Sequence, residues 1–120
     1  MSSRSDPSPD DQLPLPAATF HILVALSDAD RHGYAIMLEV AERTGGRTKL
    51  NPGTLYTTIH RLLEQGLIVE LDARPAGDDD QRRRYYRLTP FGRQVATREL
   101  ARLSELVALG RHAGLAPKRS

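Results

Sequence analysis

One nine-residue stretch restricts the fold more than any other: residues 49–57 read Lys-Leu-Asn-Pro-Gly-Thr-Leu-Tyr-Thr. Asn51 is a favoured N-cap, and Pro52 suits the first position of a helix, where no backbone N–H is needed. Apolar residues then recur at the spacing of a single helix face: Leu55, Ile59, Leu62 and Leu63. Gly66 is a typical residue to end such a helix. The stretch therefore predicts a short amphipathic helix that packs one face on a core.

The opposite face of this helix carries Thr54, Thr57 and Arg61. Two short hydroxyls and one long cation can reach base edges and phosphates in the major groove of DNA. An apolar strand, an acidic loop, a basic run at residues 82–84 and a second strand follow. Because a helix and then a hairpin with a basic tip is the order of a winged helix-turn-helix, we predict that fold, of the α+β, mainly α class.

The other elements are predicted from apolar periodicity and from breaking residues. Two helices precede the one at residue 51, and two hairpin strands and a long helix follow it. Thr89-Pro90 reads as the cap and first residue of that last helix. The predicted ranges are 17–27 and 32–44 for the first helices, 67–74 and 83–88 for the strands, and 90–112 for the final helix.

The final helix carries an apolar seam with heptad-like spacing. Two heptads are too few for a stable free coiled coil, so pairing must draw on further contacts. We predict that the seam joins two copies of the chain into a homodimer. The candidate dimerisation residues are Ala96, Leu100, Leu103, Leu106, Val107 and Gly110.

Charge is distributed unevenly along the 120 residues. Residues 82–120 hold ten Lys or Arg and two Glu, whereas the chain as a whole has a net charge of +2. A basic C-terminal third favours a polyanion as partner, although codon bias toward Arg would produce the same composition. The predicted organisation is a disordered tail over residues 1–12, a DNA-binding domain over 13–89, a dimerisation helix over 90–112 and a flexible tail over 113–120.

Several classes of protein are disfavoured. The chain has no cysteine, which excludes disulfides and Cys-based zinc sites. The four histidines lack metal-ligand spacing, so no metal or other cofactor is expected. No paired acids or nucleophile–base pair points to an enzyme. Neither a signal peptide nor a membrane-spanning run is visible, so we expect a cytoplasmic protein, associated with the nucleoid when bound to DNA.

Taken in order, several short motifs make the chain resemble the PadR family of bacterial transcriptional regulators. The matching stretches are His32-Gly33-Tyr34, Gly53 to Tyr56, Arg61-Leu62, Gly66 to Ile68, Arg84 to Thr89 and Gly92. The resemblance implies a homodimer that binds a pseudo-palindromic double-stranded DNA operator and usually represses. The lone helix after the wing resembles the short-tailed branch of the family. The resemblance to the family further implies that some members respond to a small hydrophobic or phenolic effector.

The candidate DNA-binding residues each have an alternative role. The resemblance implies phosphate contacts for Tyr34 and Tyr56, which could instead pack at the edge of the core. Arg61 could instead form an ion pair with Glu64 or Glu42. Arg82 and Arg83 are preferred over Arg84, because alternate residues of a strand face opposite ways. The full candidate set is Tyr34, Lys49, Thr54, Tyr56, Thr57, Arg61, Arg82 and Arg83.

One rival function stays open at this stage. The acidic run Asp78 to Asp80 would repel phosphates at the tip of the wing. This run favours a winged-helix module that binds proteins and has no specific DNA binding.

Overall fold

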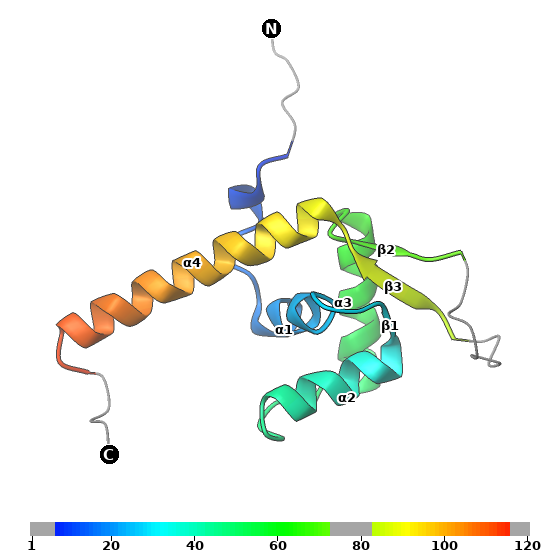
Figure 1. Ribbon diagram of the computed structural model, residues 1–120, viewed down its shortest axis with the longest axis horizontal. Coiled ribbons are helices and arrows are strands. Elements are labelled where there is room, and N and C mark those ends of the chain that lie inside the picture. The colour runs from blue at the N-terminus through cyan, green and yellow to red at the C-terminus, as the bar shows by residue number, and fades with distance from the viewer. Residues whose placement is uncertain (1–6, 73–82, 116–120) are drawn as a thin grey trace, which may run out of the picture.

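The computed structural model describes residues 7–72 and 83–115. Within those residues the chain is mainly helical, with one small sheet beside the helices (Figure 1). The elements in order are η1 (Pro9–Gln12), α1 (Ala17–Ala25), β1 (Arg31–His32), α2 (Gly33–Arg43), α3 (Pro52–Glu64), β2 (Ile68–Glu70), β3 (Tyr85–Leu88) and α4 (Pro90–His112). The predicted fold class is confirmed.

Helix α3 forms as its capping residues predict. The Asn51 side-chain oxygen accepts a hydrogen bond of 2.8 Å from the backbone N–H of Thr54, and Pro52 is the first helical residue. The apolar face is buried through Leu55, Ile59 and Leu62. The chain leaves the helix through Gly66 at a φ of +76°, a conformation that residues with a side chain rarely adopt.

The sheet has three antiparallel strands in the order β1-β3-β2, and Ile68 pairs with Leu88 in the β2–β3 hairpin. The described parts of both hairpin strands are shorter than predicted, and residues 73–82 lie outside the described ranges. Strand β1, two residues long, was not predicted. It pairs Arg31 with Tyr86 and so joins the segment before α2 to the hairpin.

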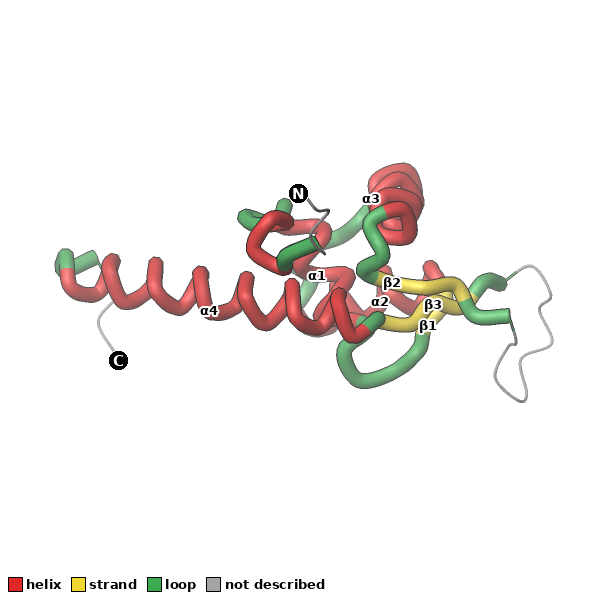
Figure 2. Tube along the Cα trace, turned by 90° about the horizontal axis from the view of Figure 1, so that it is seen from above, coloured by secondary structure: helices red, strands yellow, loops and turns green. Residues whose placement is uncertain are grey.

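The core lies where α1, α2 and α3 meet the first turns of α4 and the inner face of the hairpin. Its fully buried side chains include Ile22, Leu23, Ile36, Leu55, Leu62, Leu67 and Val95. Beyond these first turns α4 extends away from the rest of the chain, as two perpendicular views show (Figures 1 and 2). Within the described residues, no helix combines the length and the apolar character needed to cross a bilayer.

Gly92 allows α4 to begin close to the strand segment of the hairpin. A Cβ at this position would meet the carbonyl oxygen of Leu67 and lie 2.9 Å from the Leu88 Cδ1 atom. Since a backbone carbonyl cannot swing aside, Gly92→Ala must displace the helix start. We expect it to lower the free energy of unfolding by about 2 kcal/mol, measured by urea denaturation. Unchanged stability would show that α4 can shift without loss of packing.

The predicted disordered tail over residues 1–12 is wrong for the described residues 7–12. Ser8 caps η1, and the Asp10 carboxylate accepts hydrogen bonds of 2.9 and 3.0 Å from Arg98 on α4. The segment continues to Leu15, whose backbone N–H lies 3.4 Å from the Glu99 carboxylate. The segment is rich in Ser, Asp and Pro, a composition that predicts disorder. Composition could not reveal these contacts, because the partner residues lie more than 80 positions away in the sequence.

Glu99 is a second charged residue of α4 that contacts this segment. It is 2% exposed and accepts hydrogen bonds of 2.9 and 2.7 Å from the Arg102 guanidinium. The Arg102 contact lowers the pKa of Glu99, outweighing the rise that burial would cause, and the Leu15 N–H lowers it further. No local sequence pattern predicts this role for Glu99.

We expect Glu99→Gln to destabilise the fold at neutral pH by about 1–2 kcal/mol, because it removes a charged hydrogen-bond acceptor. The folded-state pKa lies below the ordinary value of 4.5, so the stabilisation is complete above that value. It is lost as the pH falls through the folded-state pKa. Urea denaturation of both proteins at one protein concentration should show a gap at pH 7 that narrows below pH 4. A gap independent of pH would contradict this role for the carboxylate.

Candidate nucleic-acid interface

The polar face of α3 is fully available to a partner. Thr54, Thr57 and Arg61 are all exposed. The alternative of an ion pair for Arg61 finds no support, because no ion pair or side-chain hydrogen bond links it to another residue within 7–72 or 83–115. Glu64 instead lies 3.4 Å from His60, one turn back along the helix. Within the described residues, α3 therefore presents on one face two hydroxyls and a guanidinium without an ion-pair partner.

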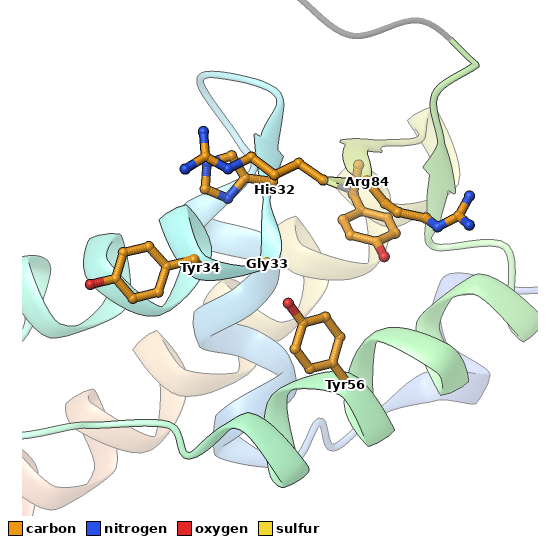
Figure 3. Close-up of a pocket in the computed structure, with 7 residues that line it drawn as sticks. His32, Gly33, Tyr34, Tyr56 and Arg84 are labelled. Atoms are coloured by element: carbon orange, nitrogen blue, oxygen red, sulfur yellow. The ribbon is translucent and has the colours of Figure 1, made fainter. Parts of the chain in front are cut away.

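Both candidate tyrosines stand at the edge of the domain. Tyr34 is 57% exposed and Tyr56 is 51% exposed, too much for residues whose main role is to fill a core. Figure 3 shows Tyr56 rising from α3 with its hydroxyl directed at Gly33, whereas Tyr34 points away along α2. The two phenols therefore occupy different parts of the same surface.

A pocket of about 460 Å³ lies where the start of α2, the side of α3 and the wing strand β3 come together (Figure 3). Burial raises the pKa of the Tyr86 hydroxyl in this pocket, and the neighbouring Glu70 and Tyr56 add to the rise. Tyr86 thus stays a neutral hydrogen-bond donor. The lining residues are His32, Gly33, Tyr34, Tyr56, Arg83, Arg84 and Tyr86.

The wing contributes a cation that sequence reasoning set aside. Arg83, a predicted contact, is exposed and lines the pocket, but so does Arg84. The Arg84 guanidinium lies 3.0 Å from the Glu70 carboxylate on the paired strand. Strand alternation alone could not reveal this, because both arginines precede β3, where regular alternation begins. Arg82 and the acidic run at residues 78–80 lie outside the described residues, so their placement stays a prediction.

Three further residues frame this surface. Lys49 is exposed just before α3, as expected for a phosphate contact. His32 caps α2 by accepting a hydrogen bond of 3.2 Å at Nδ1 from the Ala35 N–H. Its ring also packs edge-on against Tyr85, with 5.2 Å between ring centroids.

Among the residues that the structure describes, no group of three or more His, Asp or Glu could hold a metal ion.

An ion pair fixes the loop that leads into α2. The Arg87 guanidinium on β3 donates hydrogen bonds of 3.0 and 2.8 Å to Asp30. This contact lowers the pKa of the Asp30 carboxyl, so the pair is charged at neutral pH. Because Asp30 directly precedes β1, the pair holds the start of α2 in place beside the wing.

The far half of α4 exposes an apolar surface that the other described residues do not cover. The face that buries Gly92, Val95 and Glu99 continues at helical spacing to Leu103 and Leu106. Leu106 is 50% exposed and Val107 53% exposed. Of the other predicted dimerisation residues, Leu100 is exposed and Ala96, Leu103 and Gly110 are half-buried.

Comparison with known proteins places this architecture in a family. Residues 22–98 match the Transcriptional regulator PadR-like family. The transcriptional regulator Rv3488 of Mycobacterium tuberculosis is 41% identical over 90 residues, which cover 75% of this chain and 78% of that protein. The chain belongs to the PadR-like family of transcriptional regulators. This confirms the resemblance drawn from the short motifs, and the prediction of a regulator in place of an enzyme.

Solved structures agree with the PadR-like fold. A transcriptional regulator from Clostridium thermocellum superposes with a TM-score of 0.68 at 24% identity, over 78% of this chain and 86% of that one. Bacillus subtilis PadR, solved in complex with operator DNA, superposes with a TM-score of 0.60 at 22% identity. That match covers 72% of this chain and 48% of the PadR chain.

Proposed function

We propose that the protein is a homodimeric repressor that binds a pseudo-palindromic DNA operator. The observation that carries this proposal is the exposed Arg61, which has no ion-pair partner among the described residues, beside Thr54 and Thr57 on a helix whose other face is buried. Such a face suits base edges and phosphates in a major groove. The related fold of Bacillus subtilis PadR, solved with operator DNA, supports the same use of this fold.

The apolar surface of α4 supports the proposed dimer. This helix projects from its own domain with Leu106, Val107 and Leu109 exposed. Their apolar surface stays in contact with water unless a second copy of the chain covers it. Two copies related by a twofold axis would place two α3 helices about one helical turn of DNA apart. We further propose that a small hydrophobic effector, bound in apolar space between the paired α4 helices, relieves repression.

Fluorescence anisotropy tests specific binding most simply. Genomic fragments captured by the protein supply a candidate operator, and a shuffled duplex of equal length and composition supplies the control. We expect at least a thousandfold preference for the captured sequence. The affinity should fall steeply with added salt, with a slope of about −0.9 for each phosphate contact. Equal, weak binding to both duplexes would instead favour a protein-interaction module.

A further inference from the structure

Gly33 begins α2 at a position where glycine is not required by the backbone. Its φ is not among the positive values, which belong to Gly45, Gly46, Gly66 and Gly114. Glycine at the start of a helix loses more conformational entropy on folding than alanine would. Some contact must therefore compensate for the missing side chain.

The compensating contact is the phenol of Tyr56. A Cβ on Gly33 would meet the Tyr56 hydroxyl oxygen, and would lie 2.8 Å from Cζ and 2.9 Å from Cε1. Real Cβ atoms do not approach other atoms so closely, so any side chain at residue 33 would push the ring out (Figure 3). The end of the Tyr56 side chain therefore packs directly against the backbone of Gly33.

This contact fixes the Tyr56 hydroxyl in a pocket that is also lined by positively charged side chains. Tyr56 and Tyr86 bring phenol groups, and Arg83 and Arg84 bring guanidinium groups, from α3 and from the wing segment. Arg84 shares its charge with Glu70, at 3.0 Å. Guanidinium and hydroxyl donors around an open pocket match the oxygens of a phosphodiester. The pocket adjoins the polar face of α3, since Tyr56 directly precedes Thr57.

We propose that this pocket binds one backbone phosphate of the operator, and that Gly33 is the positioning residue that holds the Tyr56 hydroxyl toward it. The inference rests on the proposed DNA binding and extends it to a site that joins the helix-turn-helix to the wing. Gly33 itself touches no DNA and acts through Tyr56. Because Gly33 has no side chain, the Tyr56 phenol of α3 can pack against the start of α2.

The test is a double-mutant cycle measured on the captured operator. Gly33→Ala and Tyr56→Ala should each weaken binding by about a hundredfold, because a dimer would lose two hydrogen bonds to charged groups, each worth about tenfold. Adding Gly33→Ala to Tyr56→Ala should cause no further loss, because the displaced ring is already gone. Thermal unfolding of the same proteins shows whether each variant folds. If Gly33→Ala alone is unstable, the double variant should regain stability, since it lacks the clash.

The phosphate that binds in the pocket can be identified by removing the charge of one DNA phosphate at a time. Methylphosphonate is placed at one position of the operator at a time. One substitution should weaken wild-type binding about tenfold more than it weakens Tyr56→Phe, because the variant lacks the hydroxyl contact but keeps Arg83 and Arg84. Additive losses in the cycle, or the same loss on methylphosphonate substitution in Tyr56→Phe as in wild type, would overturn the inference while specific binding stands. Absence of specific binding by the wild type would overturn the proposed function and this inference together.

Discussion

Val107→Asp should convert the protein to a monomer with little operator affinity. Val107 is 53% exposed in the single chain and lies on the part of α4 that projects beyond the domain, so the substitution should not disturb the core. In the proposed dimer it would bury an unpaired carboxylate in each copy, which is strongly unfavourable. Loss of the second half-site would weaken operator binding by roughly 10²–10⁴-fold. Sedimentation velocity and anisotropy measure the two effects separately.

Ala101→Asp is the matched control for this variant. Ala101 is exposed on the side of α4 opposite the seam, and the substitution adds the same charge to the same helix. The control should remain dimeric and bind the operator like the wild type. An unchanged dimer for Val107→Asp, or a wild type that is monomeric at micromolar concentration, would show that the α4 seam is not the interface.

Arg61→Ala should weaken specific binding without affecting dimerisation. Each bidentate contact between a guanidinium and a base edge is worth about 1–3 kcal/mol, and a dimer would lose two of them. We therefore expect a loss of roughly 2–6 kcal/mol on the operator, with a much smaller loss on a shuffled duplex. Because Arg61 has no ion-pair partner among the described residues, its removal should leave stability nearly unchanged.

Arg98→Ala removes the same charge from a site on α4 that pairs with Asp10, away from the proposed interface. It should lower operator affinity only slightly, through the general loss of a cation. If Arg61→Ala and Arg98→Ala behave alike in an anisotropy titration, the polar face of α3 does not read the DNA bases.

Elements with local signals could be predicted closely from the sequence. Helix α4 spans Pro90–His112 as predicted, because Thr89 and Pro90 form a cap whose chemistry depends on neighbouring residues alone. Helix α3 was predicted for the same reason. The alternation of a strand likewise accounts for Tyr86, which is buried, beside Tyr85, which is half-buried.

Elements that depend on distant partners could not be predicted. Strand β1 has two residues and exists because Arg31 and His32 pair with a hairpin more than 50 residues away. The burial of Glu99 could not be predicted either, since a Glu on an amphipathic helix gives no sign of its contact with Leu15. The roles of Gly33 and Arg84 at the pocket likewise follow from packing between separate elements.

The central claim is that a dimer places two α3 helices in successive major grooves. Hydroxyl-radical footprinting of the captured operator, with the number of bound chains measured by sedimentation, tests it most directly. Two protected half-sites centred about 10 base pairs apart, with two chains bound for each duplex, is the result we predict. A single short protected segment with one bound chain, or protection spread evenly along the duplex, would contradict it.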